Sequence, residues 1–113
     1  MKWLVVDDHP RIRSFLKQLL YRPEDDWKEC GDGSEVLMVV ENYRPDWILM
    51  DVEMPLQDGI TTTQQICSLI TDQKIIIISQ HDDLELKSAA IQAGAQKYFL
   101  KSELHLLPGY LEI

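Results

Sequence analysis

Apolar runs of strand length alternate with helical patterns along this chain. Apolar residues are continuous over 3–6, 47–50 and 75–78, and the last of these runs consists of four isoleucines. β-Branched residues without polar alternation are typical of strands buried on both faces of a sheet. The strand predicted over 27–30 is weak and short, and the last strand is predicted over 97–100. The predicted strands are 3–6, 27–30, 47–50, 74–79 and 97–100.

Apolar residues at helical spacing fill the intervals between these strands. The first helix is predicted to open at Pro10, where a missing N–H group costs no hydrogen bond. A second helix is predicted over 35–42 with Ser34 as its N-cap, and a fourth over 84–93 that ends at Gly94. The expected apolar faces are Ile12, Phe15, Leu16, Leu19 and Leu20 in the first helix and, in a third helix over 61–70, Ile66, Leu69 and Ile70.

Strands that alternate with helices predict an α/β fold, in which a parallel sheet is covered by helices on both faces. The length of 113 residues suits one domain that spans 1–113. In such a sheet the carboxyl ends of the strands gather at one edge, which is where ligands bind.

Composition narrows the class of protein. The formal net charge of -8 argues against a surface that binds nucleic acid, because such a surface needs a basic patch. Cys30 and Cys67 have no metal-binding spacing, and we expect two buried thiols in a reducing compartment. The apolar runs are too short for a membrane span or a signal peptide, so we expect a cytoplasmic chain without membrane contact.

Charged residues directly follow three of the predicted strands. Asp7 and Asp8 follow the first strand, Asp51 follows the third, and Lys101 follows the fifth. Three carboxylates that converge without a partner repel one another and raise at least one pKa. A divalent cation removes this repulsion, and a lysine beside it can hold a phosphate oxygen. The pattern predicts a site that handles a phosphoryl group.

The same segments resemble the receiver domain of bacterial response regulators. The resemblance rests on Asp7-Asp8, on Asp51-Val52-Glu53-Met54-Pro55 with Gly59, on Ile78-Ser79 and on Tyr98-Phe99-Leu100-Lys101. It extends from residue 2 to about residue 102, and the motifs are closest to receivers of the LuxR/NarL type. It implies a three-layer, flavodoxin-like (βα)5 sandwich with the strand order 2-1-3-4-5.

The resemblance also implies a role for each matching residue. Asp51 corresponds to the phosphoacceptor, and Ser79 and Lys101 correspond to the residues that contact the phosphoryl group. Ser79 and Tyr98 correspond to the switch residues, which move together when the domain is phosphorylated. The implied cofactor is Mg²⁺, and its implied ligands are Asp7, Asp8, Asp51 and the backbone carbonyl of Glu53.

Partners follow from the same resemblance. The phosphoryl donor is expected to be a sensor histidine kinase or a phosphotransfer protein, and the chain is expected to be a switch and not an enzyme. Gln80, Glu53 and His81 occupy positions that influence how water reaches the acyl phosphate, so we expect an altered dephosphorylation rate.

The C-terminal segment over 102–113 departs from the family pattern. A short last helix over 103–107 is predicted to stop at Pro108-Gly109, followed by an extended or loosely packed tail. A shortened helix leaves two alternatives open. Either apolar surface of the fourth helix, last strand and last helix is exposed and supports a homodimer, or the tail is merely frayed.

Two other functions compete with the phosphoacceptor. The first is a binding module that keeps the fold and signals by protein contact without phosphorylation. The second is a Mg²⁺-dependent phosphatase with an aspartyl nucleophile, but those enzymes commonly carry a DxD motif, whereas Asp7 and Asp8 are adjacent. The sequence does not decide whether the chain stands alone or is part of a longer regulator.

Overall fold

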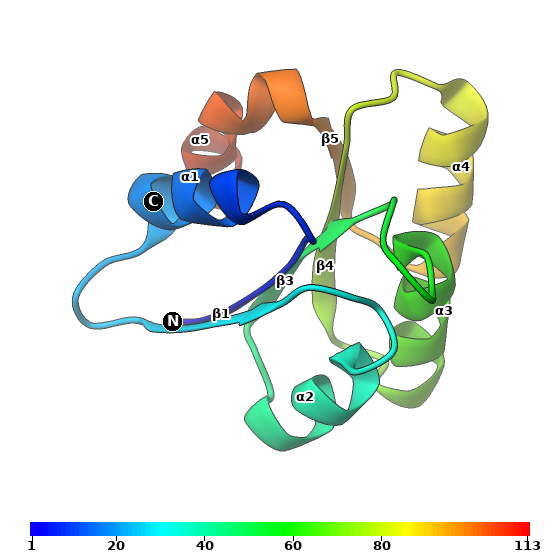
Figure 1. Ribbon diagram of the computed structural model, residues 1–113, viewed down its shortest axis with the longest axis horizontal. Helices are drawn as coiled ribbons and strands as arrows, with labels where there is room; N and C mark the ends of the chain where they lie inside the picture. Colours follow the sequence, from blue (N-terminus) through cyan, green and yellow to red (C-terminus); the bar gives the residue numbers. More distant parts are fainter.

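The computed structural model describes residues 1–113 as a five-stranded parallel sheet between two helical layers (Figure 1). The strand order is β2-β1-β3-β4-β5, so the predicted flavodoxin-like topology is confirmed. The strands are β1 (Lys2–Val6), β2 (Asp26–Cys30), β3 (Trp47–Asp51), β4 (Lys74–Ser79) and β5 (Lys97–Leu100). The helices are α1 (Pro10–Leu20), α2 (Val36–Tyr43), α3 (Gly59–Leu69), α4 (Leu84–Ala93), the 3-10 helix η1 (Lys101–Leu106) and α5 (Leu107–Leu111).

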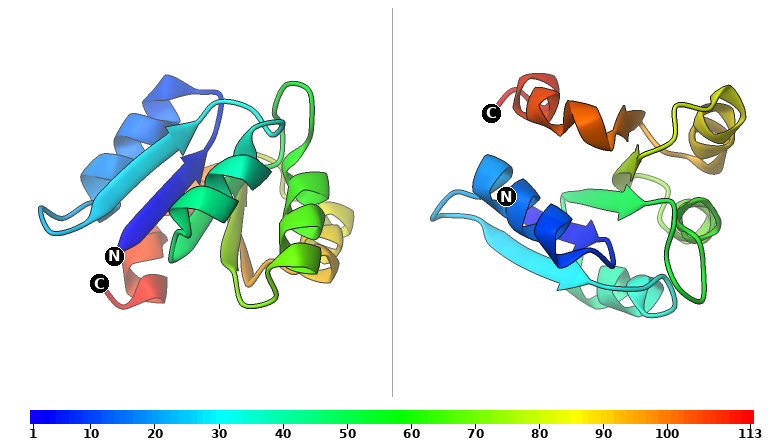
Figure 2. Two further views of the ribbon diagram at one scale, coloured as in Figure 1. Left: turned by 90° about the horizontal axis from the view of Figure 1, so that it is seen from below. Right: turned by 45° about the horizontal axis from the view of Figure 1, so that its top comes forward.

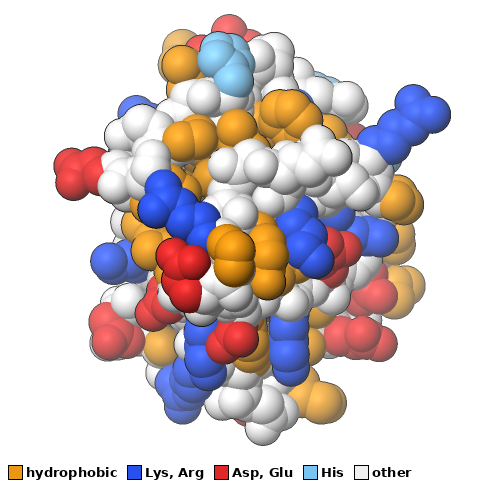
Figure 3. All heavy atoms as spheres, turned by 90° about the vertical axis from the view of Figure 1, so that its left-hand side faces the viewer, with side chains coloured by type: hydrophobic (Ala, Val, Ile, Leu, Met, Phe, Trp, Pro, Cys, Tyr) orange, Lys and Arg blue, Asp and Glu red, His pale blue; other side chains and the backbone are white.

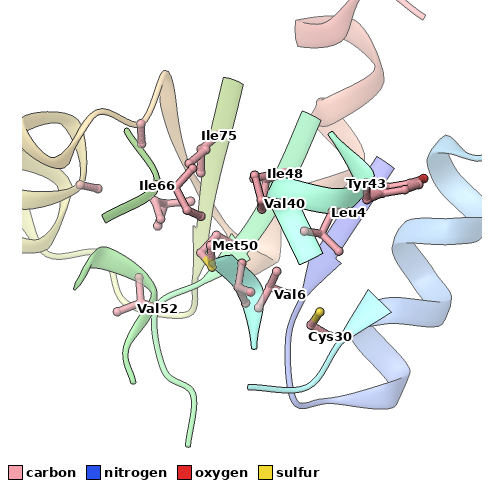
Figure 4. Close-up of a cluster of buried hydrophobic side chains, with 14 residues drawn as sticks. Leu4, Val6, Cys30, Val40, Tyr43, Ile48, Met50, Val52, Ile66 and Ile75 are labelled. Carbon is pink, nitrogen blue, oxygen red and sulfur yellow. The ribbon is translucent and has the colours of Figure 1, made fainter. Parts of the chain in front are cut away.

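Alternate side chains of each central strand belong to two separate hydrophobic cores, one on each face of the sheet. In β4, Ile75 and Ile77 point to the layer of α2, α3 and α4, whereas Ile76 and Ile78 point to the layer of α1 and α5. This division explains the unbroken isoleucine run, because both faces of the strand are covered. Figure 4 shows the first of these cores, in which Ile66 and Ile75 lie beside Met50 and Ile48.

Helix boundaries differ from the sequence prediction at two N-termini. Ser34 does not cap α2, because its N–H and hydroxyl both bind Asp32 Oδ1, at 2.8 and 2.5 Å, in a turn before the helix. Helix α3 begins at Gly59, earlier than predicted, because Asp58 Oδ1 accepts a hydrogen bond of 2.8 Å from the Thr61 N–H. An aspartate that bonds its neighbouring backbone decides the local structure in both cases.

Two residues assigned to buried helix faces are exposed. Leu69 at the end of α3 is 62% exposed and Phe15 in α1 is 44% exposed. Leu16 and Leu20 in α1 and Ile66 in α3 are fully buried and carry the contact with the sheet. The apolar stripes are therefore narrower than the sequence pattern predicted.

The C-terminal segment also differs from the prediction. Pro108 and Gly109 do not end the last helix but lie inside α5. Pro108 is in the first helical turn, where its missing N–H breaks no hydrogen bond. The last α-helix is short, as predicted, yet η1 precedes it directly. The tail folds back, because the Ile113 N–H donates a hydrogen bond of 3.0 Å to the Pro108 carbonyl. In Figures 1 and 2, α5 lies on the same side of the sheet as α1.

Charges of both signs are interspersed on the face drawn in Figure 3, with small apolar patches between them. No helix of the structure has the length and apolar character needed to cross a membrane.

Candidate functional site

The carboxyl ends of β1 and β3 and the start of η1 bring three charged side chains together. Lys101 Nζ lies 3.1 Å from Asp7 Oδ2 and 3.4 Å from Asp51 Oδ1. Both carboxylates are almost completely buried, since Asp7 is 0% and Asp51 is 2% exposed. One lysine therefore bridges two buried carboxylates at the sheet edge that the sequence predicted.

Gly59 shapes the loop that follows Asp51. A Cβ atom at Gly59 would lie 2.0 Å from the Asp51 carbonyl oxygen, so no other residue fits without moving the backbone. The Gly59 N–H donates a hydrogen bond of 2.9 Å to the Val52 carbonyl. This close return of the chain holds Asp51 at the end of β3 and starts α3 immediately behind it.

Burial and charge act together on Asp51. Burial is the largest effect and the nearby Asp7 carboxylate adds to it, so the pKa of Asp51 is raised to about 6, although Lys101 opposes the shift. Its Oδ2 atom is buried and has no hydrogen-bond partner. A buried carboxylate oxygen without a partner is costly unless another positive group meets it.

Asp7 and Asp51 belong to a cluster of side chains that can bind a metal ion. Asp7, Asp8, His9 and Asp51 each offer one ligand atom, and these atoms all lie within 4.8 Å of one another. Hard divalent cations prefer carboxylate and carbonyl oxygens. The donor set and the unpartnered Asp51 oxygen fit such an ion, so the cluster meets the chemical requirements of a cation site.

Most of the chain matches known proteins in sequence, and nearly all of it matches known structures in fold. The family model of the response regulator receiver domain matches residues 3–106. The chain belongs to this family. It is 39% identical to the transcriptional regulatory protein LiaR of Bacillus subtilis and 36% identical to the transcriptional regulatory protein YhcZ of the same organism, covering 88% and 89% of this chain and 48% of each relative. The receiver thus spans about half the length of these relatives.

Solved structures agree with this assignment. A two-component response regulator of the LuxR family from Aurantimonas superposes with a TM-score of 0.88 at 27% identity, over 98% of this chain and 81% of that one. The signal receiver domain of NarL from Mycobacterium tuberculosis gives 0.82 at 26% identity, over 98% and 93%. The predicted likeness to LuxR/NarL-type receivers of two-component systems is confirmed.

In this receiver, Ser79 and Tyr98 are joined through one residue. Ser79 ends β4 and is buried, and its Oγ accepts a hydrogen bond of 3.0 Å from the His81 N–H. Tyr98 in β5 donates from its hydroxyl to the His81 carbonyl at 2.7 Å. Both predicted switch residues therefore hold the backbone of the β4–α4 loop.

Glu53 reaches the same loop from the other side. Its side chain is exposed and contacts His81 Nε2, so the pair links the loop after β3 to the loop after β4. The sequence predicted Glu53 as a backbone ligand and as an influence on water access, and the structure shows that its side chain contacts His81. Gln80 lies exposed between Ser79 and His81.

His9 is the residue of the receiver's site that the sequence prediction missed. Its Nδ1 lies 2.9 Å from Asp7 Oδ1 and 3.0 Å from Asp8 Oδ1. The available signal was its position directly after two aspartates and before Pro10, because a residue before proline is held extended and cannot turn away into the helix.

Proposed function

We propose that this receiver domain accepts a phosphoryl group on Asp51. An ionised Asp51 oxygen attacks the phosphorus atom of a phosphohistidine, the nitrogen–phosphorus bond breaks, and an acyl phosphate forms. The observation that carries the proposal is the buried Asp51 carboxylate with one unpartnered oxygen, next to Lys101 and in a family of phosphorelay receivers.

The side chains of Asp7, Asp8 and Asp51 and the backbone carbonyl of Glu53 would hold Mg²⁺. When bound, this ion supplies positive charge that offsets the carboxylates and the incoming phosphoryl group. The Lys101 ammonium, now shared between Asp7 and Asp51, would bind a phosphoryl oxygen. The Ser79 hydroxyl lies at the end of the neighbouring strand and would donate to another.

The phosphoryl group would act through the β4–α4 loop. If Ser79 turns toward it, the His81 N–H loses its acceptor, and Tyr98 loses the fixed position of the His81 carbonyl. Both changes shift the conformational equilibrium of the face formed by α4, β5 and α5. The expected partners are a sensor histidine kinase or a phosphotransfer protein, and the chain is a stoichiometric switch and not an enzyme.

Intact mass tests the proposal. The protein is incubated with acetyl phosphate, with Mg²⁺ or with EDTA, and we expect the mass of one added phosphoryl group only with Mg²⁺. Asp51→Ala removes the adduct, whereas Asp82→Ala, which changes an exposed aspartate paired with Lys87, keeps it. A folded wild-type protein with no adduct from acetyl phosphate and no response to beryllofluoride favours the phosphorylation-independent binding module instead.

A second experiment tests the oligomeric state. Sedimentation of the protein with and without beryllofluoride reports whether a homodimer forms, for which the face of α4, β5 and α5 is the expected contact. A monomer under both conditions removes self-association from the proposal and leaves the phosphoacceptor role intact.

A further inference from the structure

The cation site contains one nitrogen donor among its oxygens. His9 belongs to the same cluster as Asp7, Asp8 and Asp51. We infer that His9 Nδ1 is a fourth side-chain ligand, which raises the affinity of the site for a first-row transition ion of the Co²⁺, Ni²⁺ or Zn²⁺ class relative to Mg²⁺. The inference rests on the proposed function only because both use the same carboxylates.

The spacing of the ligand atoms fits one shared ion. His9 Nδ1 lies 2.9 Å from Asp7 Oδ1 and 3.0 Å from Asp8 Oδ1. Neighbouring ligand atoms around an octahedral ion with bonds of about 2.1 Å are about 3.0 Å apart. The His9 nitrogen therefore stands from each of the two carboxylate oxygens at the separation of two adjacent octahedral positions.

The backbone places the His9 ring at this point. The His9 N–H donates a hydrogen bond of 2.8 Å to Asp7 Oδ1, and Pro10 begins α1 directly after it. Arg13 Nη1 in turn donates 2.6 Å to the Asp7 carbonyl. The side chain of His9 is 59% exposed, so an ion from solvent can reach Nδ1 without opening the core.

An independent observation points to a ligand at the same place. Asp51 Oδ2 is buried and has no hydrogen-bond partner, although Lys101 is close to the other oxygen of that carboxylate. A cation in the cluster would satisfy this oxygen, which the lysine does not. The donor set would then consist of carboxylate and carbonyl oxygens with one imidazole.

The types of donor atom determine which ions the site prefers. Imidazole is a good ligand for Co²⁺, Ni²⁺ and Zn²⁺, whereas Mg²⁺ takes oxygen ligands and keeps its waters. His9 should therefore control the affinity for the transition ion and leave that for Mg²⁺ nearly unchanged. If His9 instead only donates a proton to the two carboxylates, its removal affects both ions alike.

Metal titration of the free protein separates these cases. Co²⁺ alone and Mg²⁺ alone are titrated in the same buffer, and binding is followed by calorimetry and, for Co²⁺, by its visible absorption. We expect His9→Gln to weaken Co²⁺ binding at least about tenfold and to change its absorption spectrum. The affinity for Mg²⁺ should stay within about twofold.

A matched variant controls for surface histidines. His105→Gln changes an exposed histidine of η1 that lies outside the cluster, and it should bind Co²⁺ like wild type. Circular dichroism verifies that each variant is folded. Equal Co²⁺ affinity in wild type and His9→Gln, or an equal loss for both ions, overturns the inference.

Failure of the two proposals is distinguishable. Phosphorylation of Asp51 with Mg²⁺, together with Co²⁺ binding that ignores His9, supports the proposed function and rejects the histidine ligand. Co²⁺ binding that depends on His9, in a protein that is never phosphorylated, supports the histidine ligand and rejects the proposed function.

Discussion

The hydroxyl of Tyr98 donates a hydrogen bond of 2.7 Å to the backbone carbonyl of His81. The N–H of the same residue donates to Ser79 Oγ at 3.0 Å. One residue thus carries two hydrogen bonds, one to the strand end beside the site and one to β5. A change in the hydrogen bond to Ser79 therefore affects the hydrogen bond to Tyr98, and the reverse, through the His81 backbone.

Tyr98→Phe should loosen the β4–α4 loop. The variant removes one partly exposed hydrogen bond, so we expect the free energy of unfolding to fall by about 0.5–1 kcal/mol. The His81 amide should exchange faster with solvent, as measured by hydrogen exchange and NMR. Tyr110→Phe is the control, because that ring packs edge-on against Phe99 on another side of β5. Unchanged exchange at His81 would contradict the link.

The contact between Glu53 and His81 should slow water attack on a phosphorylated Asp51. The pair joins the loops on either side of the site, and its removal opens a path to the acyl phosphate. We expect His81→Ala to shorten the phosphoryl half-life by up to about tenfold, equivalent to about 1.4 kcal/mol of barrier. The readout is the decay of the phosphorylated mass after the phosphodonor is removed.

Two further variants control this experiment. Glu53→Ala combined with His81→Ala should decay no faster than the faster single variant, because both residues form one contact. Gln80→Ala tests the neighbouring exposed amide. A half-life of Gln80→Ala equal to that of wild type removes Gln80 as a determinant of the rate.

Asp51→Asn should stabilise the metal-free protein at neutral pH. The pKa of Asp51 is raised from its ordinary value of 3.8 to about 6, mainly by burial. Between these values the folded state binds the proton more tightly than the unfolded state, so wild-type stability falls as pH rises through this window. We expect Asp51→Asn to gain about 2–3 kcal/mol over wild type at pH 7, and little at pH 4.

Urea unfolding with EDTA at several pH values measures this difference. Asp32→Asn provides a control of opposite sign, because hydrogen bonds from the Ser34 hydroxyl and N–H lower the pKa of Asp32. A lowered pKa stabilises the fold above the unfolded value, and this contribution is lost as pH falls. A gain for Asp51→Asn that does not depend on pH would show that burial of charge is not its cause.

Sequence patterns predicted the site best where the geometry of the sheet allows few alternative arrangements. A parallel sheet brings strand ends to one edge, so the meeting of Asp7, Asp51 and Lys101 followed from the order of the elements. The contact of His9 with two carboxylates depends on one side-chain rotamer, and the pairing of Glu53 with His81 depends on two loops. Neither leaves a periodic signal in the sequence.

The C-terminal error had a different physical origin. Proline breaks a helix in its interior but not in its first turn, and the prediction placed the helix start at residue 103. Because α5 begins at Leu107, Pro108 falls in the first turn, where it is compatible with the helix. Helix boundaries here depend on the burial of Leu104 and Leu107 against the sheet, which only the folded chain defines.

Gly94→Ala should destabilise the receiver, because the end of α4 lies directly against α3. Gly94 has φ of 117°, and an added Cβ would lie 2.7 Å from Cys67 Sγ and 2.8 Å from Cys67 Cβ. Left-handed strain and overpacking together should cost about 2–4 kcal/mol of unfolding free energy in chemical denaturation. Cys67→Ala removes only the sulfur contact, so the double variant should recover part of the loss.

Gly109→Ala is the matched control, since nothing lies within 4 Å of its added Cβ, and it should be neutral or stabilising. Equal effects at Gly94 and Gly109 would mean that backbone entropy alone, and not the packing of α4 on α3, fixes glycine at position 94.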